Sequence, residues 1–194
     1  FFGNDGADGR SFGQSGSCNN NVVCPISAGW ENQVNATLMY LLANGTEVCS
    51  GSILNNVRQD GTPYFLSANH CYSGDYATWV FRFNYQSANC SPSQNGPTTQ
   101  SVSGASLKAR RGDSDFMLFE LSVVPPLNYN VYYAGWNNVN SPASSAVGIH
   151  HPAGDVKKFS VENDPLSSGS FGGSPANSHW EVGDWDTGTT EGGS

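Results

Sequence analysis

The chain has 194 residues, a formal net charge of −8, 23 glycines, 10 prolines and 12% charged residues, which favours one sizeable domain or two small ones built from short strands and turns. The charge argues against nucleic acid as a partner, because no cluster of Lys or Arg is present to neutralise phosphates. No apolar stretch is long enough to span a membrane and the first residues lack the features of a signal peptide, so we expect a mature secreted protein that does not bind membranes.

The chain begins with a segment that differs in composition from the rest. Residues 1–14 are rich in glycine and polar side chains, and we expect an N-terminal extension along the surface. The first clear alternation of apolar and polar residues, Val34–Ala43, predicts a strand. Asn44-Gly45 is the type of turn that joins antiparallel strands, and it leads into a second predicted strand, Glu47–Leu54.

A short apolar run ends in a histidine. Tyr64–Ala68 has the aromatic and aliphatic content of a buried strand, and Gly61 and Pro63 before it favour a turn. His70 therefore lies where the strand gives way to a loop. Because histidine can accept and return a proton near neutral pH, a strand-end histidine is a candidate general base.

The next predicted strand, Thr78–Tyr85, carries an aromatic residue at every second position. Side chains at this spacing lie on one face of a strand. We therefore expect these aromatic residues to form a barrel core and not a binding surface. They are Trp79, Phe81, Phe83 and Tyr85.

The remaining predicted strands are short, and turn-forming residues separate them. Residues 91–101 predict an exposed loop, and Val102–Arg110 and Phe116–Leu121 predict strands. Consecutive prolines in Val124–Leu127 mark the expected boundary between two halves. Ser167–Ser174 is rich in glycine and serine, which predicts a connector. The strands predicted after the boundary are Val131–Ala134, Ala146–Ile149, Lys157–Val161 and Ser178–Val182.

Several segments resemble one family of proteases, in the family's order. Phe-Leu-Ser-Ala-Asn-His-Cys at residues 65–71 resembles the catalytic-histidine strand of the trypsin-like serine endopeptidases, and the chain from about residue 15 onward resembles their bacterial lysyl endopeptidase branch. The resemblance implies an all-β fold of two six-stranded antiparallel barrels, with residues 15–124 in the first and residues 125–194 in an incomplete second barrel. The other agreeing segments are Ser15–Pro25, Cys49–Asn56, Phe83–Gln86, Ser114–Leu121, Ala134–Trp136, Gly148–Pro152 and Thr190–Ser194.

Hydrolysis by such an enzyme needs a base and a carboxylate beside the nucleophile. A serine hydroxyl is a weak nucleophile, so a histidine must accept its proton and a buried carboxylate must orient that histidine. His70 fits the base. Asp115 fits the carboxylate, because it immediately precedes an apolar strand and because Ser-Asp-Phe-Met-Leu matches the family's aspartate motif. Asp113, beside Gly112, is the alternative carboxylate, although a turn aspartate explains it better.

The nucleophile motif falls at the end of the chain. In this branch the motif resembles Thr-Glu-Gly-Gly-Ser followed by Ser-Gly-Ser-Pro, with the second serine of the pair attacking. This register places Ser194 just before the nucleophile and gives Gly193 the backbone N–H that shares the oxyanion hole. The other register, in which Ser194 itself attacks, stays open.

The five cysteines are an odd set, which in a secreted protein implies a free thiol or a partner outside the chain. The resemblance implies that Cys49 pairs with Cys71 and that Cys24 pairs with Cys90. Cys18 then pairs with a cysteine in the C-terminal part of the protease. A buried, unpaired thiol is the alternative for Cys18.

These features predict a secreted serine endopeptidase that hydrolyses peptide bonds through an acyl-enzyme, with this chain as the larger piece of a cleaved or truncated enzyme. Its expected partners are a protein or peptide substrate and the C-terminal fragment of the same precursor, disulfide-linked through Cys18. A preference for lysine follows from the resemblance alone. An inactive homologue that binds protein, and an esterase with the same triad, are the other candidate classes.

Other chemistry has less support in the sequence. His150 and His151 are adjacent, but no Cys or carboxylate lies at ligand spacing, so we predict structural roles for both and neither a metal nor a cofactor. Trp180 and Trp185 precede the serine motif, and we expect buried packing for them and not a substrate groove.

Overall fold

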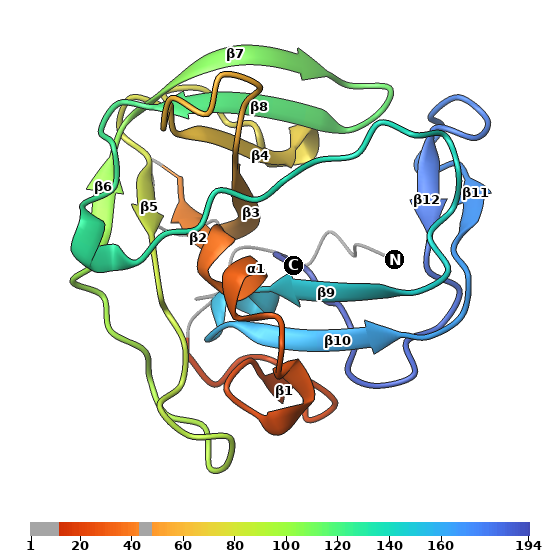
Figure 1. Cartoon of the computed structure of the whole chain (residues 1–194), viewed down its shortest axis with the longest axis horizontal. Coiled ribbons are helices and arrows are strands. Elements are labelled where there is room, and N and C mark those ends of the chain that lie inside the picture. The colour runs from red at the N-terminus through yellow and green to blue at the C-terminus, as the bar shows by residue number, and fades with distance from the viewer. Residues whose placement is uncertain (1–11, 43–47) are drawn as a thin grey trace.

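The protein is an all-β molecule whose strands form one large sheet and two small ones (Figure 1). The computed structural model describes residues 12–42 and 48–194. Strands within residues 37–121 form a seven-stranded sheet, while later strands form a two-stranded sheet and, with β1 (Asn20–Asn21), a three-stranded one. No helix of the described part is long and apolar enough to cross a membrane. The remaining elements are η1 (Pro25–Ser27), α1 (Glu31–Ala36), β2 (Thr37–Leu41), β3 (Val48–Leu54), β4 (Tyr64–Ala68), η2 (Asn69–Cys71), β5 (Val80–Arg82), β6 (Ser101–Ser103), β7 (Ala105–Arg111), β8 (Phe116–Leu121), η3 (Leu127–Tyr129), β9 (Ala146–His150), η4 (Pro152–Gly154), β10 (Lys158–Glu162), β11 (Ser167–Gly169) and β12 (His179–Glu181), where η marks a 3₁₀ helix.

The large sheet curls back on itself at Gly104. Its strands run in the order β6-β5-β2-β3-β4-β8-β7, so β6 and β7 occupy opposite edges although Gly104 alone separates them in sequence. Gly104 N–H donates to Trp79 O at 2.9 Å, and Ser122 N–H donates to Gly104 O at 2.9 Å. Gly104 has φ +85°, and a Cβ there would lie 3.1 Å from Ala77 O, so this corner requires glycine. The prediction of one strand over Val102–Arg110 is therefore wrong, because the corner divides it in two.

Aromatic side chains fill the inside of this curled sheet. Tyr40 stacks on Trp79 with ring centroids 5.2 Å apart and meets Phe65 edge to face, also at 5.2 Å. All three side chains, and Phe81 beside them, are fully buried. Aromatic pairs in such geometries contribute about 0.5–1.5 kcal/mol beyond their buried area, so apolar packing stabilises this part of the molecule.

The predicted aromatic face of Thr78–Tyr85 is confirmed for three of its four side chains, which lie in the core of the large sheet. The fourth, Tyr85, is buried in a separate cluster with Val48 and Val156. Asn84 has φ +51°, which interrupts the strand alternation just before Tyr85. The regular strand β5 is correspondingly only three residues long.

The segment before β2 is helical where the sequence predicted a strand. Because α1 covers Glu31–Ala36, the prediction for Val34–Ala43 is wrong over its first three residues and confirmed for β2. Val34 is buried in a small cluster with Phe159 of β10, a tertiary contact that outweighs the local pattern. The predicted turn at Asn44-Gly45 falls outside the described residues, whereas β3 after it is confirmed.

The C-terminal half contains two small antiparallel pairs. β9 pairs with β10, and β1 pairs with the other edge of β10, so N-terminal residues join the sheet of the C-terminal half. β11 pairs with β12. Three of the four strands predicted for this half are confirmed, but Val131–Ala134 forms only one bridge, from Ala134 to Leu54. The predicted connector Ser167–Ser174 is wrong at its first three residues, which form β11.

Both expected disulfides form. Cys49–Cys71 joins β3 to η2, the turn that carries His70, and Cys24–Cys90 ties the N-terminal segment to the loop after β5. Cys18 is exposed and forms no disulfide within the described chain. The first disulfide therefore anchors the candidate base to the large sheet.

Candidate active site

His70 and Asp115 meet at the end of the β4–β8 pair. These antiparallel strands place Ala68 opposite Phe116, so the residues just after β4 lie beside the residue just before β8. Asp115 Oδ2 lies 2.6 Å from His70 Nδ1, and His70 N–H donates to Asp115 Oδ1 at 2.7 Å. Asn69 N–H donates to Asp115 O at 2.9 Å. Both carboxylate oxygens are therefore engaged by the histidine, and the carboxylate orients the imidazole through Nδ1.

The structure brings Asp115, and not Asp113, to the histidine. Asp113 pairs with Arg111, whose Nη2 lies 2.8 Å from Asp113 Oδ2, and this guanidinium holds the pKa of Asp113 below its ordinary value. Asp115 has φ +51°, a left-handed conformation that Asp adopts more readily than most residues. The side chain of His70 is 52% exposed and that of Asp115 is 24% exposed, so the imidazole is open to solvent and the carboxylate lies deeper in the protein.

A cavity of about 400 Å³ opens beside this pair. The large sheet supplies one wall through η2, and the β11–β12 hairpin supplies another. Trp180 lines the cavity and is 43% exposed, so the expected buried packing is wrong for this residue. Trp185 instead lies against Gly148 of β9. The lining residues are Ala68, His70, Ser114, Asp115, Gly169, Ser170, Phe171, His179, Trp180, Glu181 and Ser194.

The serine motif lies in a tight loop, residues 189–194, which we call the serine loop. Ser50 Oγ–H on β3 donates to Gly193 O at 2.8 Å, and Ala153 N–H donates to Gly192 O at 2.7 Å. Gly193 has φ +91°, and a Cβ there would meet the backbone of β3 at 3.1 Å, so this position requires glycine. No residue of the described chain accepts a hydrogen bond from Gly193 N–H. Carbonyl groups of the loop are therefore bonded to both β3 and η4.

Ser194 lines the same cavity as His70, but its hydroxyl is bonded elsewhere. Ser194 Oγ lies 2.8 Å from His150 Nδ1 and accepts a hydrogen bond from Glu191 N–H at 2.9 Å. His150 is 4% exposed at the end of β9. Burial lowers the pKa of His150 to about 4, and the charge of Lys158 acts in the same direction.

Charged and polar side chains are buried behind the serine loop. Lys157 is completely buried, its Nζ donates to Val34 O at 2.7 Å, and burial lowers its pKa to about 7. His151 is also completely buried, with Nδ1 3.0 Å from Asp155 O. Burial and the nearby charge of Lys157 place the pKa of His151 well below its ordinary value. In the described ranges, no group of three or more His, Cys, Asp or Glu could hold a metal ion. We call the five buried charged and polar residues of this region the buried polar cluster: His150, His151, Asp155, Lys157 and Lys158.

Two carboxylates hold the N-terminal segment against this half of the molecule. Asp155 accepts hydrogen bonds from Gly13 N–H at 3.0 Å and from Ser15 Oγ. Burial opposes the ionisation of Asp155, but these hydrogen bonds and the Lys158 charge bring its pKa below the ordinary value. Glu191 of the serine loop accepts from Gly16 N–H at 3.0 Å. Sequence reasoning missed both carboxylates, because their partners lie 142 and 175 residues away along the chain.

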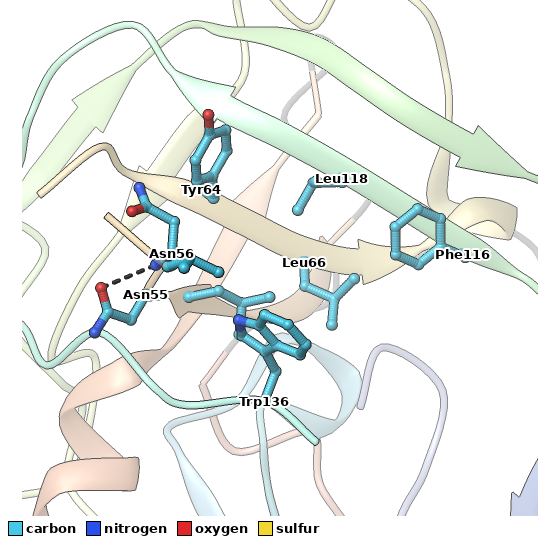
Figure 2. A pocket seen from close by; sticks show the side chains of 9 residues that line it. Asn55, Asn56, Tyr64, Leu66, Phe116, Leu118 and Trp136 are labelled. Atoms are coloured by element: carbon cyan, nitrogen blue, oxygen red, sulfur yellow. Dashed lines mark hydrogen bonds between the residues drawn. The ribbon is translucent and has the colours of Figure 1, made fainter. Parts of the chain in front are cut away.

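A second hollow, of about 400 Å³, lies on the outer face of β4 and β8. Figure 2 shows Trp136 across from Leu66, with Phe116 and Leu118 along the neighbouring strand. Tyr64 is the only titratable side chain among its described lining residues. This hollow therefore offers no group suited to acid–base catalysis near neutral pH.

The fold and the His–Asp pair define the class of protein: a trypsin-like serine protease fold, in which a curled β-sheet carries both residues at adjacent strand ends. A family model described as "Lysyl endopeptidase, C-terminal domain" matches residues 12–194, so the chain belongs to the lysyl endopeptidase family, and the resemblance in the sequence is confirmed. Lysyl endopeptidase of Pseudomonas aeruginosa is 32% identical over 197 residues, which cover 94% of this chain and 41% of that relative. The chain thus spans less than half of the relative's length.

Proposed function

We propose that this chain supplies the general base, the carboxylate and part of the oxyanion hole of a secreted serine endopeptidase that cleaves peptide bonds through an acyl-enzyme. The observation that carries the proposal is the double contact of Asp115 with His70, through the ring Nδ1 and the backbone N–H. A carboxylate bonded at Nδ1 fixes the tautomer in which Nε2 is the basic nitrogen.

In the proposed reaction, His70 accepts the proton of the attacking serine hydroxyl and later returns it to the leaving amine. Asp115 keeps the imidazole oriented and stabilises its cationic form. Gly193 N–H, for which the described residues offer no acceptor, donates to the oxyanion of the tetrahedral intermediate. Water then hydrolyses the acyl-enzyme with His70 acting again as base and acid.

The nucleophile in this proposal is the serine that follows Ser194 in the family's motif. The contacts of the Ser194 hydroxyl with His150 Nδ1 and Glu191 N–H support a role in shaping the loop and not in attack. On this register, Gly193 N–H shares the oxyanion hole with the N–H of the nucleophile. The enzyme then includes a C-terminal part, to which we propose that Cys18 is linked by a disulfide.

The proposed substrate is a protein or peptide. The Pseudomonas relative is named lysyl endopeptidase, and we extend a preference for lysine to this chain as part of the proposal. A net charge of −8 is compatible with a cationic substrate, because opposite charge raises the rate of encounter.

The test measures hydrolysis by the full-length protein that contains this chain, on matched peptides and esters with lysine, arginine or alanine at the cleaved position. We expect cleavage after lysine, its loss in His70→Ala and little change in Asp113→Asn. Hydrolysis of esters without peptides would favour an esterase. Absence of turnover and of reaction with a serine-directed phosphonate would favour an inactive homologue that binds protein.

The proposed role of Cys18 is tested by intact mass with and without reducing agent. Release of a second peptide on reduction is expected if the C-terminal part is a separate fragment. In a continuous chain, Cys18 should resist alkylation until the protein is reduced. Alkylation of Cys18 in the unreduced protein would contradict the linkage.

A further inference from the structure

The serine loop is attached to β9 and β10 by a chain of hydrogen bonds that the proposed reaction does not use. Ser194 Oγ lies 2.8 Å from His150 Nδ1, and His150 Nε2 lies 3.3 Å from Ser160 Oγ. Ser160 Oγ–H donates to Thr189 O at 2.7 Å. Since His150 and Ser160 are both buried, the first and last residues of the loop are held by one pair of strands.

The direction of each proton in this chain follows from its neighbours. Glu191 N–H can only donate, so Ser194 Oγ accepts from it and has its own hydrogen left for His150 Nδ1. The imidazole then carries its hydrogen on Nε2 and donates to Ser160 Oγ, whose hydrogen goes to Thr189 O. The arrangement in which Nδ1 accepts from Ser194 Oγ–H requires a neutral imidazole, which the burial of His150 favours.

The neighbouring residue provides a second attachment. His151 N–H donates to Ser50 Oγ at 2.8 Å, and Ser50 Oγ–H donates to Gly193 O at 2.8 Å. The peptide unit between Gly193 and Ser194 is therefore held at its carbonyl by Ser50 and at the following side chain by His150. This peptide unit leads directly to the proposed nucleophile.

We propose that His150 is a positioning residue for the oxyanion hole: its imidazole fixes the side chain of Ser194 and thereby aligns the Gly193 N–H with the nucleophile that follows. The inference rests on the proposed function and adds to it a group outside the triad. Two features are required of His150, a hydrogen-bond acceptor at the place of Nδ1 and a neutral ring. General packing would require neither.

The experiment uses the full-length protein and variants that separate these requirements. His150→Leu keeps bulk but removes the acceptor, His150→Asn keeps an amide oxygen near the place of Nδ1, and Ser194→Ala removes the other partner. Ser101→Ala is the matched control, because Ser101 lies in β6, away from the serine loop, and its hydroxyl makes one exposed hydrogen bond, to Thr98 O, within the described residues. For each variant, kcat and KM are measured per active site titrated with a serine-directed phosphonate, together with the thermal midpoint of unfolding.

We expect His150→Leu and Ser194→Ala each to lower kcat by roughly 10- to 100-fold with KM nearly unchanged, because a misaligned oxyanion donor weakens transition-state binding. The double variant should be no slower than the slower single variant, since both remove the same contact. His150→Asn should restore kcat to within about threefold of the wild type, because the acceptor is retained. Ser101→Ala should match the wild type.

Three results would overturn this role. One is an unchanged kcat in Ser194→Ala while the phosphonate labels the wild type, which contradicts the positioning role alone. Another is a fall in kcat in the double variant that equals the product of the two single falls, because the two residues would then act independently. The third is a fall in kcat that, across the His150 variants, correlates with the fall in thermal midpoint and not with the loss of the hydrogen-bond acceptor. A wild-type protein that the phosphonate does not label contradicts the proposed function itself, and the positioning role with it.

Discussion

The large sheet and the C-terminal half are stabilised by different kinds of side chain. Inside the large sheet the fully buried side chains are mainly aromatic, such as Trp79 and Phe81. Around β9 and β10 they include Lys157 and His151, and the buried polar cluster connects to the serine loop through His150. Apolar packing carries no charge, whereas buried ionisable groups make stability depend on pH. The two regions should therefore respond differently to pH.

The two parts of the candidate site lie in these two different regions. The base and carboxylate lie at the rim of the apolar region, where β4, β8 and the Cys49–Cys71 disulfide fix η2. The serine loop lies on the polar region. Ser50 joins the two, because it belongs to β3 of the large sheet and bonds to Gly193 and His151.

The largest expected effect is on activity, at the rim of the apolar region. Asp115→Asn should lower kcat of the full-length protein by about 10⁴-fold, because an amide no longer holds the imidazole in the required tautomer. The thermal midpoint should change little, since Asp115 lies outside the aromatic core. Asp113→Asn is the control and should keep kcat within about twofold, because Asp113 pairs with Arg111. A similar loss in both variants would contradict the assignment.

The apolar side of the comparison is tested by Phe81→Ala. Removing this fully buried ring should lower the free energy of unfolding by about 3–5 kcal/mol, measured by urea denaturation. The loss should be the same at about pH 6 and about pH 9, because no titrating group is removed. Val57→Ala, at a position that is 85% exposed, should change stability by less than about 0.5 kcal/mol. A strongly pH-dependent loss of stability in Phe81→Ala would contradict the expected difference in pH response between the two regions.

The polar side is tested by Lys157→Met. Lys157 has a pKa of about 7 in the folded protein and 10.5 as its ordinary value, so between these pH values the unfolded chain binds more protons. This residue should therefore make stability rise as pH increases from about 7 to about 10 and add no further change below that window. The rise should be smaller in Lys157→Met, which should also be the more stable protein near neutral pH. Equal pH dependence of the unfolding free energy in both proteins would contradict this account.

A smaller effect is expected where the N-terminal segment meets the buried polar cluster. Ser15→Ala removes a hydrogen bond to Asp155 and should lower the free energy of unfolding by about 1–2 kcal/mol at neutral pH. Because the folded pKa of Asp155 lies below its ordinary value, the ionised carboxylate stabilises the fold above that value and the contribution is lost on acidification. The difference between the variant and the wild type should therefore shrink in acid. Ser17→Ala, at an exposed position, is the control.

The difference between the two regions also determines which features could be predicted from sequence. Two strands of the large sheet, β4 and β8, are short apolar runs that the sequence predicts, and His70 and Asp115 lie in motifs that end or begin them. The buried polar cluster could not be predicted, because polarity alone favours exposure and partners such as Ser15 and Asp155 are far apart in sequence. Local backbone geometry explains other differences from the predictions. The positive φ of Asn84, for example, interrupts the alternation expected for Thr78–Tyr85.

The most direct test of the account is a crystal structure of the full-length protein after reaction with a serine-directed phosphonate. We predict that phosphorus is bonded to the Oγ of the serine following Ser194 and that a phosphonyl oxygen lies about 3 Å from Gly193 N. Ser194 Oγ should remain bonded to His150 Nδ1, and Asp115 should remain on His70 Nδ1. Phosphorus on Ser194 itself, or an adduct remote from His70, would contradict the account.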